Sequence, residues 1–121
     1  MLKLKNQGKT LVLASATGES LLTKVVKALE LDMFDMVCTE NTIGFPKRNP
    51  EFFVKLLKEL NAKPEDVIVF EDSIHSTRSA TSIKVECVTL INSLNKIHLE
   101  EFKNLSSLII KDYTDKRLEN L

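Results

Sequence analysis

The sequence has no excess of either charge and no long apolar run, and these two absences exclude several classes of protein. Lys and Arg together number 17, as do Asp and Glu, so the formal net charge is zero. A neutral chain gives no electrostatic reason to expect binding to nucleic acid or to an anionic membrane. No apolar run approaches the about 20 residues that span a bilayer, and the first residues contain no apolar signal-peptide core. We therefore expect a cytoplasmic protein with no nucleic acid partner and no membrane partner.

Cysteine is also scarce. The chain has two cysteines, Cys38 and Cys87, with no Cys-x-x-Cys motif and no Cys/His spacing typical of a metal site. Both fall in predicted strands, far apart in the sequence. This pattern favours two buried, reduced thiols over a disulfide or a zinc site.

What is present fits one globular domain. The chain has 121 residues, of which 43% are hydrophobic. This content is enough for one hydrophobic core, and the chain is too short for two domains that each have a core of their own. No internal repeat, low-complexity tract or linker interrupts it. Residues 1–121 are therefore expected to form a single domain.

Short apolar runs alternate with helical patterns along the chain. Strands are predicted at residues 10–15, 35–39, 66–71, 85–91 and 105–111. Helices are predicted at residues 19–31, 49–60 and 74–83, with the end of a helix and a turn at 1–9, a loop at 40–48, a short helix or loop at 94–104 and a short helix near the end. Alternating strands and helices predict an α/β fold with a parallel sheet.

Residues 67–73, Val-Ile-Val-Phe-Glu-Asp-Ser, run from a continuous apolar segment into two acids and a hydroxyl. Such a short apolar run predicts a strand buried on both faces of a parallel sheet. Ligands of open α/β sheets bind just past the carboxyl ends of the strands, which is where Glu71 and Asp72 fall. A hard divalent cation such as Mg2+ would relieve the repulsion between adjacent carboxylates. The alternative is that Asp72 or Ser73 simply caps the following helix.

Other polar groups follow the remaining strand ends. The strand at residues 10–15 ends in Ser15, with exposed N–H donors expected around Ala16 and Thr17, and the loop before the helix at 49–60 carries Lys47. Hydroxyl, N–H donors, ammonium and a paired acid site would together bind a phosphoryl group. Each piece also has a simpler interpretation, since Ser15 could cap a helix and Lys47 could be a solvated loop lysine.

Three motifs in this order resemble those of the haloacid dehalogenase-like (HAD) hydrolases, in particular the branch that includes β-phosphoglucomutase. LVLASAT at residues 11–17 resembles the second motif of that family, FPKRNPEFF at 45–53 the third, and VIVFEDS at 67–73 the acidic fourth. LSSLIIKDYTD at 105–115 is similar to the late strand and helix that close such cores.

The resemblance implies a three-layer, Rossmann-like parallel sheet and a role for each motif residue. Ser15 and the backbone at Ala16 would hold the phosphoryl oxygens, and Lys47 would neutralise charge on the phosphoryl group and the attacked carboxylate. Ser15 and Lys47 would thus be the catalytic and phosphate-binding side chains. Asp72, with Glu71 beside it, would support Mg2+. The implied ligand is a phosphorylated small molecule.

The sequence also departs from the family pattern. The first motif, Asp-x-Asp-x-Thr, which supplies the nucleophilic Asp and the acid/base Asp, does not occur before Ser15, and neither does the helical cap domain. The resemblance therefore implies a truncated core without its usual central first strand. The strands at 10–15 and 66–71 would then have open edges, which favour self-association, a complementing chain or direct pairing with each other.

Two functions remain open. The first is a core fragment of a Mg2+-dependent phosphatase or phosphomutase that is inactive alone because the nucleophile is missing. The second is a non-catalytic remnant that binds a phosphorylated ligand or a protein partner. An unrelated flavodoxin-like module is a weaker third possibility. Neither the substrate nor whether Met1 is the natural start follows from the sequence.

Overall fold

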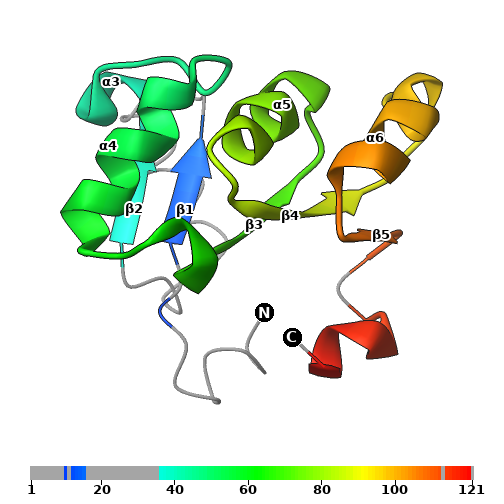
Figure 1. Ribbon diagram of the computed structural model, residues 1–121. Coiled ribbons are helices and arrows are strands. Elements are labelled where there is room, and N and C mark those ends of the chain that lie inside the picture. Colours follow the sequence, from blue (N-terminus) through cyan, green and yellow to red (C-terminus); the bar gives the residue numbers. More distant parts are fainter. Residues whose placement is uncertain (1–9, 11, 16–35, 113, 121) are drawn as a thin grey trace, which may run out of the picture. The chain divides into compact units, whose positions relative to one another are not determined.

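The computed structural model describes residue 10 and residues 12–15, 36–112 and 114–120 (Figure 1). The chain divides into two compact units, Met1–Lys47 and Arg48–Leu121, and each is described by itself. The predicted segments at 1–9 and 19–31 lie outside the described residues. The expectation of one domain stays a prediction.

The first unit contains a pair of parallel strands. β1 (Val12–Ser15) pairs with β2 (Met36–Thr39), with Val12 opposite Met36 and Ser15 opposite Thr39. Both strands were predicted from their apolar runs, and both are confirmed.

A short helix, α3 (Glu40–Ile43), follows β2 directly, so the expectation of a loop over 40–48 is wrong at its start. The cause is a capping box: the Thr39 hydroxyl accepts from the Thr42 N–H, and the Thr42 hydroxyl accepts from the Thr39 N–H. Gly44 ends the helix with φ 93°, a left-handed conformation that glycine adopts without steric cost.

The second unit is built on a three-stranded parallel sheet in the order β3-β4-β5. Its strands are β3 (Ile68–Glu71), β4 (Glu86–Leu90) and β5 (Leu108–Ile110). The central strand β4 buries Cys87, Val88 and Thr89 completely. The parallel α/β fold predicted from the sequence is therefore confirmed.

β3 is less buried than predicted. Ile68 is 37% exposed, and only Glu71 at the end of the strand is buried. The expectation of burial on both faces is thus wrong for β3, which is an edge strand of the three-stranded sheet described here. The described strands form two sheets, one in each unit, and direct pairing of β1 with β3 stays a prediction.

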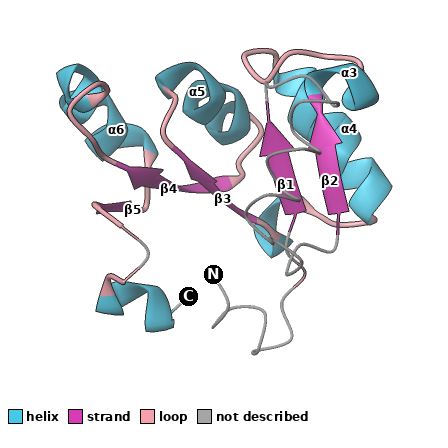
Figure 2. Cartoon of the chain, turned by 180° about the vertical axis from the view of Figure 1, so that it is seen from behind, coloured by secondary structure: helices cyan, strands magenta, loops and turns pink. Residues whose placement is uncertain are grey.

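Three helices belong to the second unit. α4 (Pro50–Leu60) begins at the predicted cap, where the Asn49 side chain accepts from the Glu51 N–H, and buries Phe52, Phe53, Leu56 and Leu57. α5 (Ile74–Ser82) and α6 (Leu99–Leu105) lie over the same face of the sheet, as the two opposite views show (Figures 1 and 2). Short 3-10 turns complete the unit at Pro64–Asp66, Lys96–His98 and Lys116–Asn120.

α5 packs through small hydroxyl residues as well as through Ile74 and Ala80. Ser76, Thr77 and Ser79 are all buried. The Thr77 hydroxyl donates to the Ser73 carbonyl one turn earlier, so burial leaves it hydrogen-bonded. Among the described residues, no helix is both long and apolar enough to cross a membrane.

Candidate functional site

The end of β1 and the loop after α3 come together within the first unit. The Lys47 ammonium donates to the Ala14 carbonyl oxygen at 3.4 Å, and the Lys47 N–H donates to the Glu40 carboxylate at 2.8 Å. Ala14 directly precedes Ser15, the last residue of β1. The structure thus brings Lys47 to the strand end that carries Ser15. Ala16 lies outside the described residues.

The two acids stand at the end of β3, in the second unit, and they differ sharply in environment. Glu71 is only 5% exposed, whereas Asp72 is exposed. One carboxylate oxygen of Glu71 accepts from the N–H groups of Asp72 (3.1 Å) and Ser73 (3.2 Å). Glu71 therefore fixes the backbone of the turn that presents Asp72.

Ser73 is the residue that caps the next helix. Its hydroxyl accepts from the Ser76 N–H at the start of α5. The capping alternative considered for Asp72 or Ser73 is thus realised by Ser73. Asp72 makes no helix-capping contact among the described interactions, and it directly precedes the cap residue of α5.

The acid pair fits a hard divalent cation in its donor chemistry. Mg2+ is held in proteins by one or two carboxylates and keeps several waters. Asp72 offers an exposed carboxylate, while one oxygen of Glu71 is already engaged with the backbone. Within the described residues, no group of three or more His, Cys, Asp or Glu side chains is arranged to hold a metal ion. A cation held by the described acids would therefore need water for most of its ligands.

The four residues predicted for the site fall into two pairs. Lys47 and Ser15 belong to the first unit, and Glu71 and Asp72 belong to the second. Each pair lies at the carboxyl end of a parallel strand, where ligands of open α/β sheets bind.

Sequence reasoning missed Asn95. This residue is 9% exposed, and its side-chain amide donates to the carbonyl oxygens of Asp72 and Leu90, each at 2.8 Å. The available signal was the pair Asn92 and Asn95, spaced like a turn directly after the strand at 85–91.

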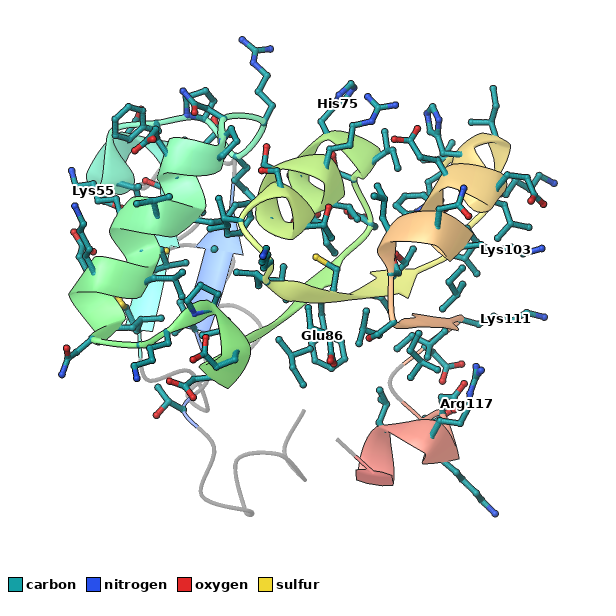
Figure 3. The ribbon with its side chains drawn as sticks, viewed as in Figure 1. Lys55, His75, Glu86, Lys103, Lys111 and Arg117 are labelled. Atoms are coloured by element: carbon teal, nitrogen blue, oxygen red, sulfur yellow. The ribbon has the colours of Figure 1, made fainter. Side chains whose placement is uncertain are left out.

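Burial also perturbs one thiol near the acids. Cys87 is fully buried on β4, opposite Val69 of β3. Burial, followed by the charges of Glu71 and Glu86, raises the pKa of Cys87 to about 12. Figure 3 shows Glu86 on the face of the sheet away from α5. Cys87 and Cys38 are both buried and reduced, as predicted.

Comparison with known proteins gives consistent results. The family model for haloacid dehalogenase-like hydrolases matches residues 1–90. YhcW of Bacillus subtilis, a protein assigned to the phosphatases, is 27% identical over 118 residues, covering 97% of this chain and 49% of that protein. The phosphorylated carbohydrates phosphatase of Thermotoga maritima is 31% identical over 93 residues, covering 75% of this chain and 43% of that protein.

A search of solved structures also finds a similar fold. The crystal structure of a protein assigned as a β-phosphoglucomutase from Thermotoga maritima superposes with a TM-score of 0.77 at 29% identity, covering 91% of this chain and 51% of that one. The chain thus spans about half the length of the relatives it matches. With three quarters of its residues inside the family model, the chain belongs to the haloacid dehalogenase-like hydrolases.

Proposed function

We propose that this chain forms the phosphoryl- and metal-binding part of a Mg2+-dependent phosphatase or phosphomutase. The observation that carries the proposal is the contact between the Lys47 ammonium and the Ala14 carbonyl. It puts a positive charge at the strand end that also bears Ser15. A phosphoryl group needs such charge and such hydrogen-bond donors around its oxygens.

Each side chain has a proposed role. Lys47 neutralises negative charge on the phosphoryl group, and Ser15 with the backbone at Ala16 donates to its oxygens. Asp72, on the turn fixed by Glu71, would hold Mg2+. When bound, the ion would supply electrostatic stabilisation of the negative charge on the phosphoryl oxygens. The proposed ligand is a phosphorylated small molecule, the class that one relative's name specifies as carbohydrates.

The covalent step needs a carboxylate nucleophile that the chain does not supply. No Asp-x-Asp-x-Thr sequence occurs in its 121 residues. We therefore propose that the chain alone turns over no phosphate ester, and that activity needs the missing motif from a complementing chain or segment. Strand edges are the proposed place of such complementation or of self-association. The proposed location is the cytoplasm.

The test combines binding with turnover. The chain alone is assayed with Mg2+ and a generic aryl phosphate, and Mn2+ binding is followed by paramagnetic broadening of backbone amide signals. We expect no turnover, and broadening centred on Asp72 that Asp72→Asn removes. Glu65→Gln, which neutralises another exposed acid, is the matched control and should leave the broadening unchanged. Turnover abolished by Asp72→Asn would show that a nucleophile is present after all.

The absence of the first motif also favours a second candidate, a non-catalytic member that binds a phosphorylated ligand or a protein. A polypeptide carrying an Asp-x-Asp-x-Thr strand distinguishes the two. Turnover on adding it supports the enzyme. Phosphate binding without turnover in its presence supports the non-catalytic candidate.

A further inference from the structure

Asn95 joins the two loops that follow neighbouring strands in the second unit. One hydrogen of its side-chain amide goes to the carbonyl of Asp72 after β3, and the other goes to the carbonyl of Leu90 at the end of β4. Both donor–acceptor distances are 2.8 Å. Both donor hydrogens of this buried amide are therefore used, and both are used at the edge of the sheet where Asp72 lies.

The other side of the amide is fixed as well. The Asn95 side-chain oxygen accepts from the Asn92 N–H at 2.7 Å, and the Asn92 side-chain oxygen accepts from the Asn95 N–H at 2.9 Å. Turning the Asn95 amide over would bring its oxygen against two carbonyls and its NH2 against an N–H. The reciprocal pair therefore sets the direction in which Asn95 donates.

We propose that Asn95 is a positioning residue that holds the Asp72 carbonyl, and with it the turn that presents the Asp72 carboxylate. Glu71 holds this turn through the Asp72 and Ser73 N–H groups, and Asn95 holds it through the opposite polar group of the same residue. The backbone of Asp72 is thus fixed on both its donor and its acceptor side. The inference rests on the proposed function only in assigning Asp72 to the metal.

The first experiment needs no metal. Hydrogen exchange is measured at the Asp72 and Ser73 amides in the wild-type chain, in Asn95→Leu and in Asn92→Ala. Asn95→Leu is similar in size and uncharged but cannot donate. Asn92→Ala is the matched control, because it removes the bonds to Leu94 and Asn95 in the same turn and leaves the Asn95 side chain in place.

We expect exchange at Asp72 and Ser73 to become about tenfold faster in Asn95→Leu, since all three hydrogen bonds of the Asn95 side chain are lost, including the one that holds the Asp72 carbonyl. The Val85 amide, which donates to Ala80 at 3.1 Å, serves as the reference for global opening and should not change. Equal acceleration at Val85, or no acceleration at Asp72, would overturn the inference. If Asn95→Leu does not fold, Asn95→Ser, which is small and still polar, takes its place.

The second experiment adds Mn2+ at a temperature where all variants are folded. Loss of a partner that orients a metal ligand typically weakens metal binding by about 10- to 100-fold, which is the change expected for Asn95→Leu. If Asn95→Leu binds Mn2+ with the affinity of the wild type, the inference about Asn95 is overturned, but the proposed metal site is not. No Mn2+ binding in the wild type would instead refute the metal site, and the exchange experiment would still decide the role of Asn95.

Discussion

The Lys47 ammonium lies 3.4 Å from the carbonyl oxygen of Ala14, a residue 33 positions earlier in the chain. The Glu40 carboxylate, at the start of α3, anchors the Lys47 N–H at 2.8 Å. The short helix α3 thus helps to hold Lys47 beside the end of β1. This contact turns three separate sequence features, a strand end, a helix start and a loop lysine, into one local arrangement.

Replacing Lys47 by methionine is expected to weaken binding of inorganic phosphate by about tenfold or more, because hydrogen bonds to a charged group contribute about 1.5–3 kcal/mol. Amide chemical shifts followed during a phosphate titration measure the affinity. Lys55→Met is the matched control, since Lys55 is an exposed lysine on α4 (Figure 3). If the two variants bind inorganic phosphate with equal affinity, Lys47 is not part of the phosphate site.

Lys84 adopts φ 66°, a left-handed conformation that a side chain with a Cβ disfavours. Glycine pays no such steric cost, so Lys84→Gly is expected to increase the free energy of unfolding by about 0.5–1 kcal/mol, after the larger chain entropy of unfolded glycine is subtracted. Urea unfolding measures the change. Asn61 has φ 52° and serves as the comparison. Because asparagine tolerates this region, Asn61→Gly should increase the free energy of unfolding by less than Lys84→Gly does. A loss of stability in Lys84→Gly would contradict the argument.

The sequence was most informative where local signals and burial agree. Asn49 and Pro50 predicted the start of α4, and the apolar runs predicted all five strands that the structure describes. The capping box at Thr39 and Thr42 is equally local, but its hydroxyl pair sits in a segment without helical apolar spacing. That segment was therefore assigned to a loop.

Two features depended on contacts far apart in the sequence. The packed face of α5 contains Ser76, Thr77 and Ser79, whose hydroxyls give no apolar periodicity although they are buried. Asn95 contacts Asp72 from 23 positions away. Identifying it required knowing that β3 and β4 are neighbours, which the order of strands along the chain does not settle. The acids themselves were visible because they directly follow an apolar run.

Thr89 and Ser106 form a hydroxyl pair with oxygens 2.5 Å apart, and Thr89 is fully buried. Thr89→Val removes this hydrogen bond while the half-buried Ser106 hydroxyl remains, so we expect a loss of about 0.5–1.5 kcal/mol in the free energy of unfolding. Removing both hydroxyls in Thr89→Val/Ser106→Ala should cost less than the sum of the single changes. Denaturant unfolding of the wild type, the two single variants and the double variant gives the coupling energy between the two hydroxyls. Strict additivity would show that they act independently.

Cys87 predicts a specific loss of stability at alkaline pH. Its thiol has a pKa of about 12 in the folded chain, raised by burial and then by the charges of Glu71 and Glu86, against an ordinary value of 9.0. Below pH 9 both the folded and unfolded states keep the proton, so stability is unaffected. Between about pH 9 and pH 12 the unfolded state releases the proton while the folded state retains it, so the free energy of unfolding falls as the pH rises.

Unfolding in urea at pH 8 and pH 10.5 measures this slope in the wild-type chain and in Cys87→Val. All other groups are the same in both proteins, so the difference between the two slopes isolates the thiol. We expect the wild type to lose more stability than Cys87→Val over this interval. Equal slopes would show that Cys87 titrates in the folded chain as it does in the unfolded one, and that the interior around β4 does not disfavour the thiolate.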